Sequence, residues 1–138
     1  MPIFARNKER AVQSFILKVV NNNCPDMTAL LEGPRADQRV NLSIAITVVP
    51  VKDGRPSVDE AFAAVTKEFS NTGLGLILDG PRGLDEVILG FRWERDRTFV
   101  LAKAKHLNPM GGGFYQLGFR MTDLVHVGDY PELDSLIV

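Results

Sequence analysis

The stretch VNLSIAITV, residues 40–48, decides the fold because the period of the apolar residues changes there. Every second residue from Val40 to Val48 is a branched apolar one, and Asn, Ser, Ala and Thr stand between them. A repeat of two is typical of a strand with one buried face and one face in water. This stretch therefore predicts a half-buried β-strand.

Five further short runs with strand character follow this stretch. They span residues 61–69, 73–79, 86–94, 98–106 and 113–121. The run 61–69 is the least certain of them, since its alternating positions include alanine, which also suits helices. Turns with Gly, Pro or charged residues separate the runs, as at Asp53-Gly54, 79–83 and 108–113. Six short strands at this spacing predict an antiparallel barrel or sandwich instead of a parallel sheet.

Upstream of residue 40 the apolar period is about 3.6, which is typical of helices. Within residues 7–23, four apolar residues follow the i, i+3, i+4, i+7 spacing of one helix face: Val12, Phe15, Ile16 and Val19. The three asparagines at 21–23 are expected to end this helix, and residues 24–33 could form a second short one that Gly33 closes.

The tail DYPELDSLIV, residues 129–138, ends in apolar residues, so it is expected to dock as a turn of helix or to contact a partner. The chain thus divides into an N-terminal helical segment (1–33), a β-barrel (34–128) and a C-terminal tail (129–138). At 138 residues it is long enough to bury one core.

The composition excludes several classes of function. Sixteen basic residues face 17 acidic ones, whereas a general nucleic-acid binder carries a basic excess. The single cysteine, Cys24, excludes an internal disulfide and suits a reducing cytoplasm. No apolar run approaches the roughly 20 residues that cross a bilayer, and His106 and His126 lack metal-ligand spacing. We expect a cytoplasmic protein that is not inserted in a membrane and that has no metal or cofactor.

Two arginines, Arg35 and Arg39, stand four positions apart in PRADQRV, residues 34–40, directly before the first strand. A guanidinium is always charged and planar, and it binds phosphate or the O6/N7 edge of guanine with two hydrogen bonds. The pair could therefore clamp a small nucleotide. The alternative is that both are surface residues in weak ion pairs.

A second polar stretch, EFSNTGLGL, residues 68–76, joins two predicted strands. Gly73 permits positive φ and the close approach of a ligand, and Ser70, Asn71 and Thr72 offer hydrogen bonds. The carboxylate of Glu68 is able to accept from the N1–H and N2–H₂ groups of a guanine. Taken alone, this stretch is better explained as an ordinary hairpin turn built from Ser, Asn and Gly.

Together the two stretches resemble the signature of the PilZ domain family. That signature is RxxxR, here RADQR at 35–39, followed some tens of residues later by (D/N)xSxxG, here EFSNTG at 68–73. Glu68 stands where the family has Asp or Asn. The strand YQLGFRMTDL, residues 115–124, is similar to the closing strand of the family, so the resemblance covers about residues 34–124.

The resemblance implies a mainly β fold, a six-stranded antiparallel barrel, and a non-catalytic receptor for the bacterial second messenger cyclic di-GMP. By position, Arg35 and Arg39 would hold phosphates and guanine edges, Glu68 would accept from a guanine, and Ser70 would reach a phosphate or base. Gly73 would permit the tight turn. The N-terminal helix is the candidate output, with a protein partner that the sequence does not identify.

Two other functions remain open at this point. The extra methylene of Glu68 moves its carboxylate by about 1.5 Å, so the chain could be a PilZ-like interaction module that binds no nucleotide. A small barrel could also bind single-stranded nucleic acid through a basic face, although few aromatic residues accompany that face. The cations of that face are Arg92, Arg95, Arg97, Lys103 and Lys105.

Overall fold

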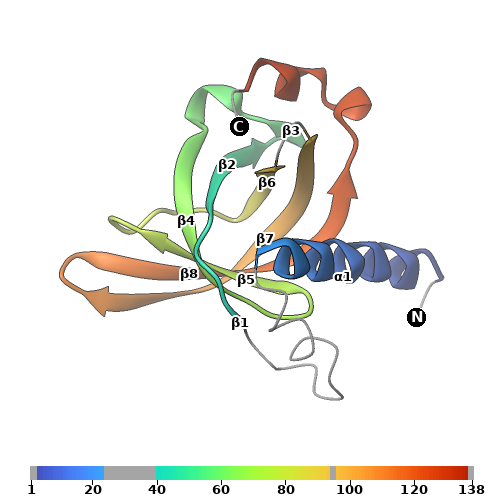
Figure 1. Cartoon of the computed structure of the whole chain (residues 1–138). Helices are drawn as coiled ribbons and strands as arrows, with labels where there is room; N and C mark the ends of the chain where they lie inside the picture. The colour runs from blue at the N-terminus through green and yellow to red at the C-terminus, as the bar shows by residue number, and fades with distance from the viewer. Residues whose placement is uncertain (1–2, 24–39, 94–95, 137–138) are drawn as a thin grey trace.

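The computed structural model describes residues 3–23, 40–93 and 96–136 (Figure 1). Helix α1 (Ile3–Asn23) comes first, and the 3-10 helix η2 (Val58–Glu60) interrupts the strands. The strands are β1 (Val40–Asn41), β2 (Ala45–Lys52), β3 (Arg55–Pro56), β4 (Phe62–Phe69), β5 (Gly73–Leu78), β6 (Glu86–Trp93), β7 (Asp96–Gly111) and β8 (Phe114–Val125).

Six of these strands form a closed antiparallel barrel, which confirms the predicted fold class. The order is β4-β5-β8-β7-β6-β2, and β2 pairs again with β4 from Ala45↔Val65 to Val48↔Phe62, which closes the ring. β1 continues beside β4, and β3 folds back on β2. Closure gives backbone groups of the six strands partners on both sides, so the barrel wall has no continuous open edge.

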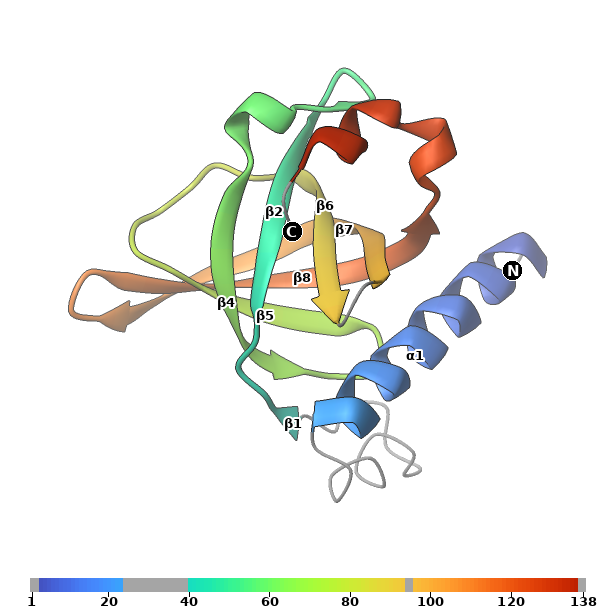
Figure 2. The same cartoon turned by 45° about the horizontal axis from the view of Figure 1, so that its top comes forward.

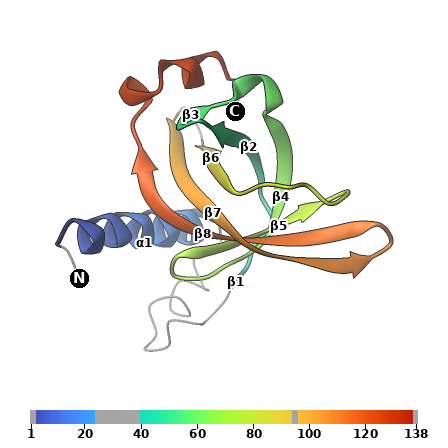
Figure 3. The ribbon, with the colours of Figure 1, turned by 180° about the vertical axis from the view of Figure 1, so that it is seen from behind.

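The core matches the two periods of the sequence. Val40, Leu42, Ile46 and Val48 are buried, as their alternation predicted. The predicted apolar face of α1 is buried too, and the ring of Phe15 meets that of Phe91 edge-on at 5.0 Å between centroids. Figure 3 shows α1 lying next to β8. The amphipathic helix therefore completes the core instead of standing apart from the barrel.

The C-terminal tail docks on the barrel in 3-10 turns, η3 (Val127–Asp129) and η4 (Pro131–Ser135). Leu133 is fully buried against a second apolar cluster with Val49, Ile88 and Phe99. This confirms that the tail docks as a turn of helix. Figure 2 shows the tail and α1 toward opposite ends of the barrel.

Three details of the prediction are wrong. The run 40–48 is two strands and not one, because residues 42–44 separate β1 from β2 and the N–H of Ile44 donates to the hydroxyl of Thr66. The turn expected at 108–113 is much shorter, because β7 continues to Gly111 and β8 starts at Phe114. The resulting hairpin projects on the side away from α1 (Figures 1 and 3). The run 61–69 is a strand, but its odd-numbered residues do not share one face: Val65 is exposed whereas Phe69 is buried.

The expected helix at 24–33 lies outside the described residues. Among the residues that the structure describes, no helix has the length and apolar character that a bilayer span requires.

Candidate functional site

The serine-glycine turn between β4 and β5 is tied by its own polar groups. The backbone N–H of Ser70 donates to the carbonyl of Gly73 at 3.0 Å, and the N–H of Gly73 donates to Ser70 Oγ at 3.0 Å. A Cβ on Gly73 would lie 2.6 Å from that Oγ, which is too close for any carbon. Glycine is thus required at position 73 because Ser70 Oγ lies so close to it. Its backbone conformation does not require glycine, since its φ is not in the left-handed region.

A β-bulge in β4 brings two adjacent charged residues to the outside of the barrel. Thr66 pairs with Leu76 and Glu68 pairs with Gly75, so Lys67 is an extra residue in the ladder. Thr66 and Phe69 are both fully buried, whereas Lys67 and Glu68 are only partly so. The bulge re-aims the side chains, and it explains why the alternation of 61–69 fails.

The middle of the site is a floor made by two glycines. Gly75 of β5 and Gly118 of β8 are register partners, so the sheet surface there carries no side chain of its own. A Cβ on Gly75 would lie 2.8 Å from Gln116 Nε2. The amide of Gln116 therefore lies across β5 and donates to Glu68 Oε1 at 2.8 Å.

Lys67 completes this polar bridge over β5. Its Nζ donates to Gln116 Oε1 at 3.2 Å, so the amide of Gln116 is engaged at both ends. The longer side chain of Glu68 is accommodated because Gly75, its partner across the ladder, leaves the space that Gln116 and Glu68 share.

A second bulge, in β7, forms the opposite wall. Ala104 pairs with Phe119 and His106 pairs with Gly118, so Lys105 is the extra residue. Lys105 and His106 are both exposed, and the imidazole ring of His106 lies within 3.1 Å of where a Cβ on Gly118 would stand. Each wall thus presents two adjacent polar side chains above the glycine floor.

A hollow of about 80 Å³ lies between the two walls. Its polar lining residues are Glu68, Ser70, Lys105, His106 and Gln116. A carboxylate, a hydroxyl, an amide, an ammonium and an imidazole therefore surround one shallow site on the outer face of β4, β5, β8 and β7. This set offers hydrogen bonds of both polarities to a base or a phosphate.

The structure brings together three of the predicted site residues. Glu68, Ser70 and Gly73 line the hollow. Asn71 does not, because it lines a different hollow, beside Gln13 and Leu17 of α1. Arg35 and Arg39 lie outside the described residues.

The chain enters the barrel beside this site. Val40 pairs with Phe69 and Asn41 pairs with Glu68. Thr66 is fully buried, and its hydroxyl donates to the carbonyl of Leu42 at 2.6 Å and accepts from the N–H of Ile44 at 2.9 Å. The hydroxyl of Thr66 thus fixes the path of the chain between β1 and β2. It thereby also holds the beginning of the barrel next to the site.

Sequence reasoning missed the contributions of Gln116, Lys105 and His106. Strict alternation predicts Lys105 outside and His106 inside, together with Ala104, so the bulge was needed to bring both outside. The glycines in GLGLIL and LGF were the available signal, since a glycine in a strand marks a close approach of other groups.

The basic face considered for nucleic acid is divided in the structure. Arg92 and Arg97 are register partners at one end of β6 and β7. The guanidinium of Arg97 is bound by the tail, to Asp134 and to the carbonyl of Leu136. Lys103 and Lys105 lie farther along β7, and Arg95 lies outside the described residues.

No protein-family model and no curated protein matches the sequence. Among solved structures, the chain is similar to the Bacillus subtilis inhibitor of motility MotI/DgrA, with 14% sequence identity and a TM-score of 0.46. The match covers 69% of this chain and 45% of that one, so this chain spans less than half the length of that protein. At this identity and TM-score the likeness does not identify a family for the chain.

Proposed function

We propose that this protein is a PilZ-like, non-catalytic receptor that binds cyclic di-GMP on the outer face of the barrel. The observation that carries the proposal is the pairing of Val40 with Phe69. Val40 follows Arg39 in the sequence, and Phe69 stands between Glu68 and Ser70. The residue that directly follows the first motif in the sequence therefore pairs with a residue inside the second motif.

The chemistry of the hollow supports a guanine nucleotide. The Glu68 carboxylate, held by the amide of Gln116, is a fixed acceptor for the N1–H and N2–H₂ donors of a guanine. The hydroxyl of Ser70 accepts from the N–H of Gly73 and keeps its own proton to donate to a phosphate or to an acceptor on the edge of a base. Arg35 and Arg39 supply the positive charge that a ligand with two phosphates requires.

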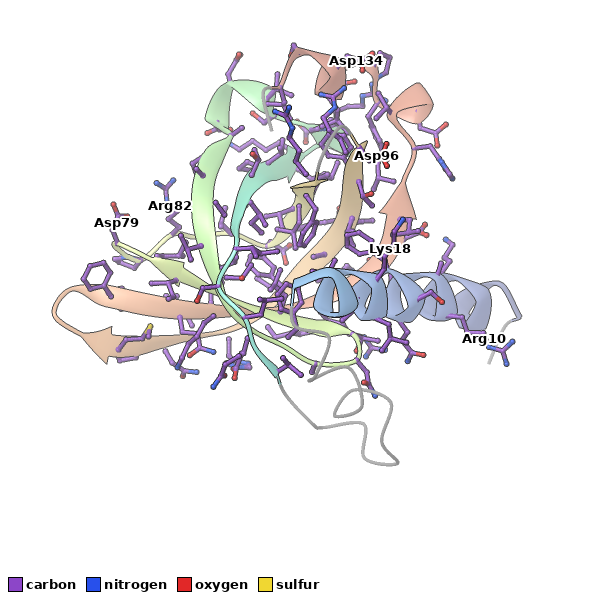
Figure 4. All side chains as sticks on the ribbon, viewed as in Figure 1. Arg10, Lys18, Asp79, Arg82, Asp96 and Asp134 are labelled. Carbon is purple, nitrogen blue, oxygen red and sulfur yellow. The ribbon has the colours of Figure 1, made fainter. Side chains whose placement is uncertain are left out.

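Calorimetric titration with cyclic di-GMP tests the proposal. We expect the wild-type protein to bind, and Arg35→Ala and Arg39→Ala each to weaken binding at least ~10-fold, because a hydrogen bond to a charged group contributes about 1.5–3 kcal/mol. Arg10→Ala is the matched control, since Arg10 is exposed on α1 (Figure 4). Absence of heat from a wild-type protein that is folded by circular dichroism would overturn the receptor function.

We also propose that binding is relayed through α1. The helix is packed on the barrel by Val12, Phe15, Ile16 and Val19, and it precedes the arginine motif in the chain. Only a difference in ligand affinity between two arrangements drives such a change. Hydrogen exchange with and without cyclic di-GMP checks it: protection is expected to change across residues 26–40 and in α1, and unchanged protection would exclude the relay.

One observation favours a second candidate, an interaction module that binds no nucleotide. The projecting β7–β8 hairpin exposes three large apolar side chains, Leu107, Met110 and Phe114, with 37%, 41% and 49% of their surface accessible. Exposed apolar groups close together are typical of protein contacts. The same titration separates the two functions, because only the receptor gives heat that the arginine substitutions remove.

A further inference from the structure

The wall formed by β7 has a feature that the signature residues do not account for. Lys105 and His106 line the hollow, yet neither has a hydrogen-bond or ion-pair partner among the described residues. Among the described residues several other cations are ion-paired, such as Lys52 with Glu60, Arg55 with Glu132 and Arg97 with Asp134. Lys103, which lies outside the hollow, has no such partner among them either. Two donors in one hollow are thus left available to a ligand.

The bulge at Lys105 explains why the side chains of Lys105 and His106 both line the hollow. Without an extra residue, Lys105 and His106 would point to opposite faces of β7. With it, both side chains reach the outer face, where Gly118 leaves room for the imidazole. Bulges of this kind occur next to binding sites, where they re-aim a side chain.

The two wall strands have two other strands between them, and their side chains reach toward each other over the glycines of those strands. β4 and β7 are separated by β5 and β8, so three strand spacings of about 4.8 Å set them roughly 14 Å apart. The carboxylate of Glu68 lies on the β4 side, and Lys105, which has no ion-pair partner among the described residues, lies on the β7 side. A ligand that contacts both walls must therefore have an acceptor for the ammonium and a separate donor for the carboxylate.

We propose that Lys105 and His106 form the second half of the nucleotide site, where they bind a phosphate of the same cyclic dinucleotide whose guanine contacts Glu68. This inference rests on the proposed receptor function. Since the Gln116 amide lies over Gly75 and the His106 ring lies over Gly118, the planar base would rest on these two groups between the walls. Lys105 supplies a point charge and His106 a ring N–H donor to the phosphate oxygens.

Matched substitutions on one strand test the proposal by calorimetry with cyclic di-GMP. We expect Lys105→Ala to weaken binding about 10-fold, the cost of one charged hydrogen bond, and the double variant with His106→Ala to weaken it further. Lys103→Ala is the control, because Lys103 is exposed on β7 and does not line the hollow. It removes the same charge from the protein, and its affinity is expected to stay within about twofold of wild type.

The histidine NMR signals give a readout without substitutions. His106 lines the hollow, whereas His126 lies just before η3 at the tail. At saturating cyclic di-GMP the imidazole signal of His106 is expected to shift while that of His126 does not.

The outcomes separate the two proposals. A wild-type protein that gives no heat and no shift overturns the receptor function together with this inference. A wild-type protein that binds, with Lys105→Ala equal to Lys103→Ala and an unmoved His106 signal, overturns only the second half of the site.

Discussion

The two regions where cations gather on this barrel use them differently. At the tail, Arg55 binds both carboxylate oxygens of Glu132, at 2.6 and 3.1 Å, and lies 5.0 Å from the ring of Tyr130. Figure 4 shows Asp134 in the same region, where it accepts from Arg97. In the hollow, Lys105 and His106 have no such partners within the described chain.

The comparison shows that neither the net charge of a region nor its number of arginines indicates whether that region could bind a ligand. The tail region is closed by Leu133 and by paired charges, so its arginines hold the chain to itself. In the hollow, Lys105 and His106 have no hydrogen-bond or ion-pair partner among the described residues, so a ligand could engage them. Under the proposed function, a cation binds the ligand where it both lines the hollow and lacks an internal carboxylate, and the predictions below test whether the two regions differ in this way.

The largest expected effect is on the stability of the tail region. Leu133→Ala removes a fully buried side chain and leaves a cavity, which costs about 2–5 kcal/mol. Urea unfolding measures this cost. Cyclic di-GMP affinity is expected to remain as in wild type, and an equal loss of affinity would show that the two regions are not independent.

Thr66→Val breaks the link between the barrel wall and the entry of the chain. The isosteric change leaves the N–H of Ile44 and the carbonyl of Leu42 without this partner, and because the first of these hydrogen bonds is only partly buried, the total cost is about 1–3 kcal/mol. Thr66→Ser keeps the hydroxyl and serves as the control. Equal midpoints in urea for both variants would contradict the role of that hydroxyl.

Gly118→Ala tests whether the position of the His106 ring matters for binding in the hollow. The new Cβ would stand 3.1 Å from the ring of His106, so the imidazole must move. Stability is expected to change by less than about 1 kcal/mol, because the loss is local and Ala lowers the entropy of the unfolded chain. Cyclic di-GMP affinity is expected to fall severalfold.

Gly80→Ala is the control for that substitution, since nothing lies within 4 Å of a Cβ there. If both glycine variants bind equally well, the position of His106 does not matter to the ligand.

The smallest effect is a pH dependence of the tail. The pKa of Glu132 is lowered from its ordinary value of 4.5 by a hydrogen bond from its own backbone and by Arg55. A lowered folded-state pKa stabilises the fold above the ordinary value, and this contribution is lost as the pH falls through the lowered value. Thermal unfolding between pH 6 and pH 3 is expected to show a steeper loss for wild type than for Glu132→Gln, and parallel curves would contradict the pairing.

Much of the barrel could be predicted from the sequence, because alternation and helical spacing report directly which residues are buried. Val40 to Val48 and the apolar face of α1 are examples. The bulges could not be predicted, because one extra residue adds no repeating pattern of its own. It only shifts the inward and outward alternation of the residues that follow by one position. That shift separates Val65 from Phe69 and brings His106 to the outer face.

Only those residues of the candidate site that belong to the sequence signature could be predicted. Ser70 and Gly73 form the expected turn, but the partner of Glu68 is Gln116, 48 residues away, and only the strand order brings them together. Glycine is likewise needed at position 75 because the side chain of Gln116, which belongs to β8, occupies the space that a Cβ would take.

The two bulged lysines have a consequence for how this surface varies among related genes. Deleting the codon for Lys67 or Lys105 would leave regular pairing on both sides of the cut, with the interior residues still facing inward. A single deletion would thus remove one positive charge from the rim at little cost to folding. The charge of this surface is therefore adjustable by chain length as well as by residue type.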